Sequence, residues 1–326
     1  MTNSKQILAM IRSHAAGDNQ QFLSIAEHIA SDADKAGKNK VADEIKNLVQ
    51  RVRSQATNSR PVGPIPMAAP RGELSSLVKA SYPEVRVSDL VVNSDLRERI
   101  LWVVREHRER ETLEAEGMQP RRKFLFSGPP GTGKGMTAAA MACELGLPLF
   151  KIRLDGVITK YLGETAAKLR LIFDAMHTAR GVYFFDEVDA LAASRGSEND
   201  IGEARRMLNS FLQFLEEDQS LSLIIAATNH RSLLDSALFR RFDEAFAYAN
   251  PSPEEARQVL RNNLLRFDRE ALAWSEVDSC AGGLSQADLA AAAENAGRVA
   301  VLAHERVLTT EVLCRALSDR ANIHRE

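Results

Sequence analysis

The chain has 326 residues, enough for two or three domains with sizeable cores. Its net charge of −2 provides no global basic field, which argues against a nucleic-acid-binding protein. The three cysteines are widely spaced and match no metal-binding pattern, and no apolar run reaches the roughly 18 residues that a membrane span needs. With no secretion signal at the start, the sequence predicts a cytoplasmic protein whose cysteines are buried or free thiols.

Residues 1–56 show apolar positions at helical spacing in three stretches, separated by polar turns that contain glycine. This pattern predicts a small N-terminal helical bundle, whose core would be marginal by itself. Because the bundle is dispensable for nucleotide chemistry, we expect it to dock a substrate or a partner. The alternative is a structural appendage or a set of helices that serves ring assembly.

Residues 57–84 are predicted to be a linker, because prolines and glycines concentrate between residues 57 and 72. Residues 85–92 are rich in β-forming side chains and precede a helix with an apolar stripe. The charged stretch 105–116 is expected to be a solvated helix face that runs into a loop.

Five apolar segments then alternate with helical patterns: residues 123–126, 148–154, 182–186, 222–227 and 245–249. Such alternation predicts an α/β domain over residues 85–250, with a parallel five-stranded sheet covered on both faces. Ligands of such sheets bind beyond the carboxyl ends of the strands. Residues 251–326 are helical in pattern, starting at a capping box with Ser252 and Glu255, and predict a small all-α lid subdomain.

The segment 124–137 joins an apolar run to a glycine-rich turn and an alanine-rich, helix-prone stretch. It contains G-x-x-x-x-G-K, in which glycines let backbone N–H groups wrap a phosphate and Lys134 reaches the β- and γ-phosphates. The following helix adds free N–H groups and its positive dipole end. We therefore expect a nucleotide to be bound by Gly128, Pro129, Pro130, Gly131, Thr132, Gly133, Lys134, Gly135 and Met136.

Gly135 departs from this pattern, in which a serine or threonine after the lysine supplies a hydroxyl to Mg²⁺. Thr137 is a poor substitute, because two residues along a helix correspond to a rotation of roughly 200°. One hypothesis is that water fills the metal position and hydrolysis survives. The other, which we favour, is intact nucleotide binding with impaired metal handling and slowed turnover.

The segment 182–187 is an apolar run that ends in two acids, Asp186 and Glu187. At the end of a strand, Asp186 can hold Mg²⁺ or its water shell, and Glu187 can poise a water molecule as a general base. Adjacent acids are common at helix starts, but the apolar run and the phosphate loop favour a catalytic pair here. Asp189 is expected to cap the following helix or to support the site.

Asn229 closes the fourth apolar segment, where its amide can bond the attacking water or the γ-phosphate, although asparagine is also a common turn residue. Arg240 and Arg241 follow. Exposed arginines often form salt bridges that contribute little stability. An arginine that instead reaches the γ-phosphate held by a neighbouring subunit acts as an arginine finger. We expect Glu187, Asn229, Arg240 and Arg241 to be the catalytic residues.

In this order, the motifs resemble those of the AAA+ ATPases, and within them the AAA subgroup of protein unfoldases and remodellers, over residues 85–320. The resemblance identifies residues 128–135 as Walker A, residues 185–187 as the end of Walker B and Asn229 as sensor 1. It identifies Arg240 and Arg241 as the finger pair, in a loop shorter than usual. It also implies ATP and Mg²⁺ as cofactors, and Asp89 and Val91 as lining of the adenine pocket, with help from the region near Gly283.

Two more segments resemble features of that subgroup. Lys160, Tyr161 and Leu162 are similar to the pore loop, in which an aromatic ring grips a threaded polypeptide without reading its sequence. Residues 195–200 resemble a second pore loop. Residues 283–289 resemble the lid motif, except that Gln286 stands where the subgroup usually has glycine.

The resemblance implies a homo-oligomeric ring, expected to be a hexamer, that uses ATP to thread a protein substrate chosen by the N-terminal bundle. Because the sequence has no H-E-x-x-H or G-x-S-x-G motif, any degradation would need a separate protease. The alternative, motivated by Gly135, is a nucleotide-gated assembly switch with weak hydrolysis. A DNA-handling AAA+ protein is disfavoured by the absence of a basic patch, and no membrane partner is expected.

Overall fold

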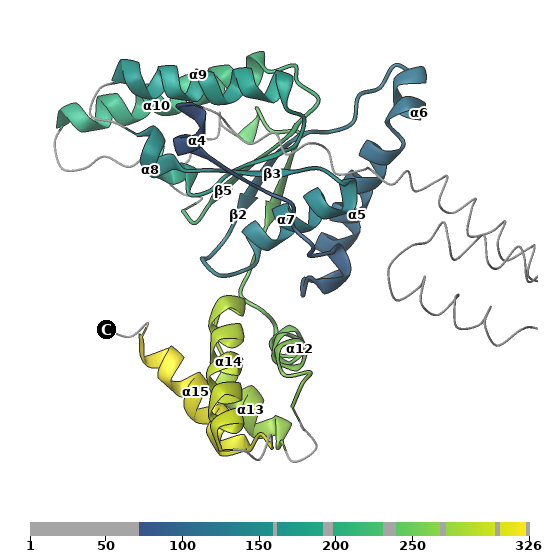
Figure 1. Cartoon of the computed structure of the whole chain (residues 1–326), viewed down its shortest axis with the longest axis vertical. Coiled ribbons are helices and arrows are strands. Elements are labelled where there is room, and N and C mark those ends of the chain that lie inside the picture. Colours follow the sequence, from purple (N-terminus) through teal and green to yellow (C-terminus); the bar gives the residue numbers. More distant parts are fainter. Residues whose placement is uncertain are drawn as a thin grey trace, which may run out of the picture. The chain divides into compact units, whose positions relative to one another are not determined.

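The computed structural model describes residues 72–158, 162–191, 198–230, 239–267, 272–303 and 307–323. These residues all belong to Ala68–Glu326, the second of the two units into which the chain divides. The predicted N-terminal bundle, residues 1–56, and the first part of the predicted linker lie outside the described residues. An α/β part comes first in the described chain, and an all-helical part follows it (Figure 1).

The α/β part is built on a six-stranded sheet with the order β1-β3-β4-β5-β2-β6. Strands β2 to β6 are parallel, and β1 runs antiparallel to β3 at one edge. The predicted α/β fold with five parallel strands is confirmed, and the sheet has one further strand, the antiparallel β1, which the sequence analysis did not predict. The strands are β1 (Val78–Ser81), β2 (Lys123–Ser127), β3 (Leu149–Ile152), β4 (Val182–Phe185), β5 (Leu223–Thr228) and β6 (Glu244–Ala247).

The linker prediction is wrong for its last third, because helix α4 (Leu74–Leu77) and β1 lie within residues 57–84. Leu77 and Val78 are buried in the core, and the backbone N–H of Arg153 donates to Leu77 O at 2.8 Å. Residues 85–92 form no strand, since a single 3₁₀ turn, Val87–Asp89, occupies their middle. These segments are too short for local side-chain preference to decide their structure, and tertiary packing decides it instead.

Helices cover both faces of the sheet, as Figure 1 shows: α9 and α10 lie on one side, and α5 and α7 lie on the other. Alternate residues of β4 enter the two layers, Tyr183 and Phe185 on the α9 side and Val182 and Phe184 on the α7 side. This two-sided burial is why the sequence of β4 is continuously apolar. The helices are α5 (Ser94–Arg108), α6 (Arg110–Ala115), α7 (Lys134–Leu145), α8 (Leu154–Val157), α9 (Leu162–Thr178) and α10 (Glu198–Glu217), with a 3₁₀ turn η2 (Val188–Leu191) after β4.

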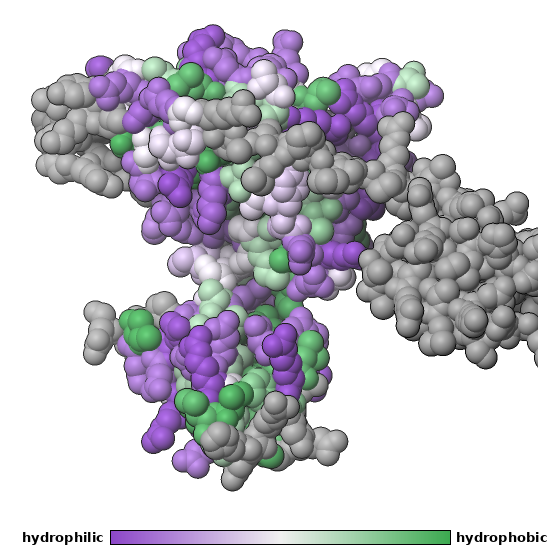
Figure 2. Space-filling model, viewed as in Figure 1, coloured by the Kyte–Doolittle hydropathy of each residue, from purple (hydrophilic) through white to green (hydrophobic). Residues whose placement is uncertain are grey.

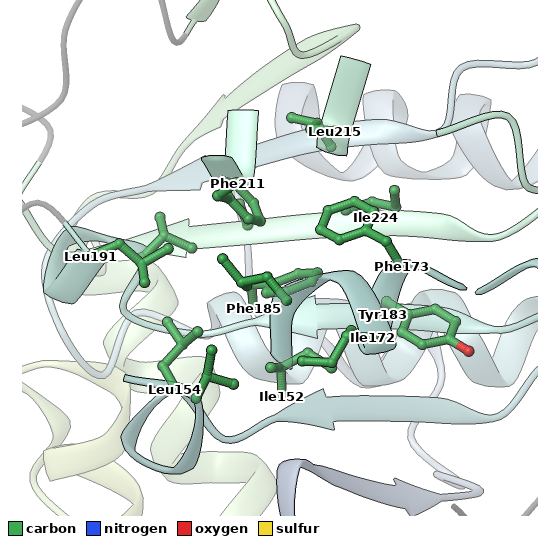
Figure 3. Close-up of a cluster of buried hydrophobic side chains, with 14 of the residues drawn as sticks. Ile152, Leu154, Ile172, Phe173, Tyr183, Phe185, Leu191, Phe211, Leu215 and Ile224 are labelled. Atoms are coloured by element: carbon green, nitrogen blue, oxygen red, sulfur yellow. The ribbon is translucent and has the colours of Figure 1, made fainter. Parts of the chain in front are cut away.

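Phe211 of α10 is fully buried in the layer between the sheet and α9, where aromatic rings meet (Figure 3). Its ring centroid lies 5.1 Å from that of Phe185 and 6.0 Å from that of Phe173. We expect Phe211→Ala to lower the free energy of unfolding by about 3–5 kcal/mol, because the cavity it leaves can collapse only partly. Urea unfolding measures the loss; the exposed Leu221→Ala is the control and should change it by less than about 0.5 kcal/mol. A loss for Phe211→Ala no larger than that of the control would contradict this packing.

The all-helical part contains α12 (Pro253–Asn263), α13 (Trp274–Ala281), α14 (Gln286–Leu302) and α15 (Thr310–Ile323), which enclose their own apolar core. Helices α12 and α14 begin with complete capping boxes at Ser252 and Ser285, and the first of these was predicted. Cys280 and Cys314 are distant in the sequence, but their thiols hydrogen-bond in this core, and burial raises the pKa of Cys314 to about 12.

Apolar side chains are also exposed on the surface of this helical part, where Figure 2 shows several of them in green. The most exposed are Leu265, Leu302 and Ile323. Within the described ranges, no helix has both the length and the apolar character that crossing a bilayer requires.

Candidate nucleotide-binding site

A cavity of about 800 Å³ opens at the carboxyl ends of β2, β4 and β5, and residues near Asp89 and from α12 and α14 form further walls. Most of the residues predicted to bind the nucleotide line it: Asp89, Val91, Pro130, Gly131, Gly133, Lys134, Gly135, Met136, Asp186, Glu187 and Asn229. Cavities of this size hold cofactors and substrates in many proteins, and this position follows the general rule for parallel sheets.

The glycines of the phosphate loop are required by its backbone and by close neighbours. Gly133, which directly precedes α7, has φ 93°, a left-handed conformation that side chains disfavour. Gly131 has φ 74°, and a Cβ there would lie 2.5 Å from the Ser285 hydroxyl. Its carbonyl accepts a hydrogen bond from the backbone N–H of Ala287 at 3.1 Å. The loop is therefore fitted directly against the first turn of α14.

Lys134 is buried at the floor of the cavity, with only 6% of the residue exposed. Its ammonium donates to Gly128 O, Pro129 O and the side-chain oxygen Oδ1 of Asn229, each at 2.8 Å. All three donor positions of the ammonium are thus used, which fixes its direction. Burial lowers the pKa of Lys134, and the smaller effect of the nearby carboxylates, Asp186 first, raises it.

Three predicted loop residues support the site without lining it. The carbonyls of Gly128 and Pro129 orient Lys134, and the buried Thr132 hydroxyl donates to Pro129 O at 2.8 Å. Thr137 faces away from the cavity, as predicted: it is fully buried and its hydroxyl donates to Gly133 O at 3.1 Å.

The acidic pair follows β4 in a strained turn. Glu187 has φ 55°, the one positive φ of a non-glycine residue in the described chain. Such a conformation costs free energy, and it turns Glu187 out of the strand direction beside Asp186. Asp189 accepts the backbone N–H of Asn229 at 3.2 Å, so this residue supports the position of the sensor asparagine.

The fit of a magnesium ion to these residues is incomplete. Asp186 lines the cavity and is the carboxylate that would hold the ion together with the ATP phosphates. Position 135 offers no side-chain oxygen, and a Cβ there would stand 3.6 Å from the Phe184 ring, an ordinary contact distance. In the described part of the chain, no cluster of three or more potential metal-ligating side chains exists. Bound magnesium would neutralise phosphate charge, and among the described residues Asp186 is the side chain that we expect to hold it.

Several lid residues that line the cavity were missed by the sequence reasoning. Gln286 stands where the lid motif usually has glycine, and its Nε2 donates to Val91 O at 2.7 Å. A Cβ on Gly133 would lie 3.4 Å from Gln286 Oε1, so this side chain spans the predicted adenine pocket and the phosphate loop. Gln258, Asn262 and Asn263 of α12 also line the cavity. The sequence identifies these residues only as part of the lid, because their contact with the cavity depends on how the lid folds against the phosphate loop.

The two candidate finger arginines do not line this cavity. Arg241 Nε pairs with Glu216 Oε1 at 2.8 Å. Arg240 is exposed and forms no ion pair with any residue in the described ranges. Of the predicted pore loop, Lys160 and Tyr161 lie outside the described residues, and Leu162 is described only as the first residue of α9. Residues 195–197 of the predicted second pore loop also lie outside the described residues, and residues 198–200 are the start of α10.

Comparison with known proteins places this site in a family. A family model described as ATPase family associated with various cellular activities (AAA) matches residues 124–249. The uncharacterized AAA family ATPase y4kL of Sinorhizobium fredii is 33% identical over 311 residues, which cover 94% of this chain and 92% of that protein. The ATP-dependent zinc metalloprotease FtsH 3 of Sphaerobacter thermophilus is 32% identical over 227 residues, covering 67% of this chain but 46% of the relative.

Among solved structures, the crystal structure of the FIGL-1 AAA domain is similar with a TM-score of 0.60 and 21% identity. The similarity covers 77% of this chain and 91% of that domain, and at this identity it bears on the fold alone. The phosphate loop, the acidic pair and Asn229 surround one cavity, and the sequence identity to y4kL extends over nearly the whole chain. The chain therefore belongs to the AAA family of ATPases.

Proposed function

We propose that this ATPase is a protein remodeller that works as a ring, in which each catalytic centre is completed by the neighbouring copy. The observation that carries the proposal is the placement of Arg240. It is exposed and absent from the lining of its own cavity, whereas Glu187 and Asn229 line that cavity. No arginine is among the described residues that line this cavity, which supports an arginine supplied by another copy.

Arg240 is the better candidate for this finger, because Arg241 is engaged by Glu216. Within one cavity, Lys134 would hold the phosphates, Asn229 would orient the attacking water, and Glu187 would accept its proton. The exposed apolar residues of the helical part, such as Leu302, support contact between copies. A hexamer with Mg-ATP is the form that we expect from the family resemblance.

Protein substrates are supported by the sequence of residues 159–164 and by relatives. FtsH 3 is named as an ATP-dependent metalloprotease, and the peroxisomal ATPase PEX6 of Penicillium chrysogenum is 35% identical over 187 residues. This chain spans only 46% and 13% of those two relatives, so their activities serve as a guide to the class of substrate. We expect the Tyr161 loops to pull a polypeptide, and residues 1–56 to choose it.

Tyr161→Ala tests the remodelling function. The change should abolish ATP-dependent unfolding of a fluorescent reporter with an unstructured tail, because a methyl group cannot grip an extended chain. Phosphate release should stay within about twofold of the original rate, since Tyr161 has no role in the chemistry of the cavity. Tyr161→Phe keeps the ring and should keep unfolding. Unfolding by Tyr161→Ala at the original rate would refute the proposal.

A nucleotide-gated assembly switch is the second candidate, and Gly135 is the observation that favours it. Such a protein would assemble when ATP binds and would hydrolyse it slowly. ATP-driven assembly without reporter unfolding, and with phosphate release close to that of Glu187→Gln, would select the switch over the remodeller.

A further inference from the structure

We propose that Lys151 is a built-in counter-ion for Asp186 and lets this chain bind ATP without a divalent cation. The ammonium would replace part of the positive charge that magnesium brings to an ATP site. The inference rests on the proposed function in one respect, namely that the cavity at Lys134 and Asp186 is where ATP is hydrolysed. It concerns a strand residue that no nucleotide-binding motif includes.

The sheet register brings Lys151 to this position. In the parallel pair β3–β4, Lys151 lies opposite Phe184, so the two side chains share one face of the sheet. Phe184 belongs to the apolar layer beneath α7, the helix that begins at Lys134. Asp186 comes two residues after Phe184, beyond the end of the strand. Lys151 is therefore on the same side of the sheet as the phosphate loop.

Three distances define the arrangement. Lys151 Nζ lies 3.0 Å from Asp186 Oδ2, a charge-assisted contact. The same Nζ lies 5.8 Å from the centroid of the Phe184 ring. A Cβ on Gly135 would meet that ring at 3.6 Å. Lys151 and Gly135 thus lie next to the same phenyl ring. A magnesium site would have a hydroxyl at position 135 and no ammonium paired with Asp186.

The charges of the cavity explain why this matters for ATP. Asp186 and Glu187 both line it, and two carboxylates without counter-ions would repel a polyphosphate. Magnesium normally removes this repulsion by binding carboxylate and phosphates together. Here the ammonium of Lys151 is already paired with Asp186. A magnesium ion would have to displace Lys151 from Asp186 and would find no hydroxyl at position 135.

The competing explanation is a surface salt bridge without function. The side chains are 53% and 34% exposed, and such pairs usually stabilise a fold by less than about 1 kcal/mol. The two explanations differ in their effect on ligand binding, not on stability. If the pair is only a surface contact, removing the lysine leaves the affinity for ATP unchanged in the presence and in the absence of magnesium.

The test measures the affinity of the full chain for ATP, by displacement of a fluorescent ATP analogue, in EDTA and in excess magnesium. We expect the original chain to bind ATP with dissociation constants within about threefold of each other in the two conditions. Lys151→Met should weaken binding in EDTA by about tenfold, equivalent to about 1.4 kcal/mol. In magnesium its affinity should stay within about twofold, because the freed Asp186 can then hold the ion.

Two variants control for charge and fold. Lys79 of β1 lies directly opposite Lys151 in the β1–β3 pair and is also exposed. Lys79→Met removes the same charge from the neighbouring strand and should change neither affinity. Lys151→Arg keeps a cation beside Asp186 and should keep binding in EDTA. The double variant Gly135→Thr with Lys151→Ser should bind ATP markedly better in magnesium than in EDTA.

The inference is overturned if the original chain binds ATP at least about thirtyfold more weakly in EDTA and Lys151→Met shows the same ratio. In that case the ATP site stands and only the role of Lys151 fails. If the original chain binds no ATP in either condition, the proposed function fails, and the inference fails with it.

Discussion

Glu187→Gln should lower ATP hydrolysis by about a hundred- to ten-thousandfold while ATP remains bound. Glu187 lines the cavity beside Asp186, and its positive φ turns it out of the path of β4. Glutamine has nearly the same shape but cannot accept the proton of the attacking water. Because the site still contains Lys134 and Asn229, the affinity for ATP should change by less than about threefold. Measuring phosphate release and ATP affinity on the same preparation separates a loss of hydrolysis from a loss of binding.

Glu98→Gln is the matched control for this change. Glu98 is exposed on α5 and does not line the cavity, so its neutralisation should leave hydrolysis unchanged. Undiminished hydrolysis in Glu187→Gln would mean that another group accepts the proton, and the assignment of the general base would have to be abandoned.

Lys134→Met should weaken ATP binding by about a hundredfold, equivalent to about 2.7 kcal/mol. The change removes the buried cation of the phosphate loop together with its bonds to Gly128 O, Pro129 O and Asn229 Oδ1. A hydrogen bond to a charged group contributes about 1.5–3 kcal/mol, which sets the scale. Since burial lowers the pKa of Lys134, ATP binding should also decline at a less alkaline pH than an ordinary lysine would give.

Lys168→Met offers a comparison with similar chemistry outside the cavity. Lys168 is also held by a backbone carbonyl, that of Gly156, at 2.9 Å. Its replacement should leave the affinity for ATP within about twofold, as measured with the same fluorescent analogue. Equal losses in the two variants would indicate a general effect on the fold, and thermal unfolding of both would show it.

The parts of the site that are contiguous in sequence were predictable. The phosphate loop and the acidic pair each lie at the end of an apolar strand, and strand ends in a parallel sheet meet at one edge. The sheet itself was predictable because strands and helices alternate along the chain, which is typical of a parallel sheet. In contrast, β1 has four residues and one buried side chain, Val78, which leaves no period in the sequence to detect.

Other features depend on contacts between distant segments. Gln286 reaches Val91 across 195 positions of the chain, and Lys151 meets Asp186 only because β3 and β4 pair in a particular register. Gln286 departs from the lid motif in which it lies, and Lys151 belongs to no motif, so composition and spacing carry no signal for either contact. The ion pair between Arg241 and Glu216 is another contact between distant segments. The sequence does not distinguish Arg240 from Arg241, whereas this ion pair does.

The most direct test of the shared catalytic centre mixes two inactive variants. Arg240→Ala keeps Glu187 but has lost the proposed finger, and Glu187→Gln keeps Arg240 but has lost the general base. In a ring with shared centres, an Arg240→Ala site next to a Glu187→Gln copy is complete. At equal amounts, half of the sites keep Glu187 and half of those have such a neighbour, so phosphate release should recover to about one quarter of the original rate. If the mixture stays as inactive as its components although both variants bind ATP and assemble, the catalytic centre is not shared between copies.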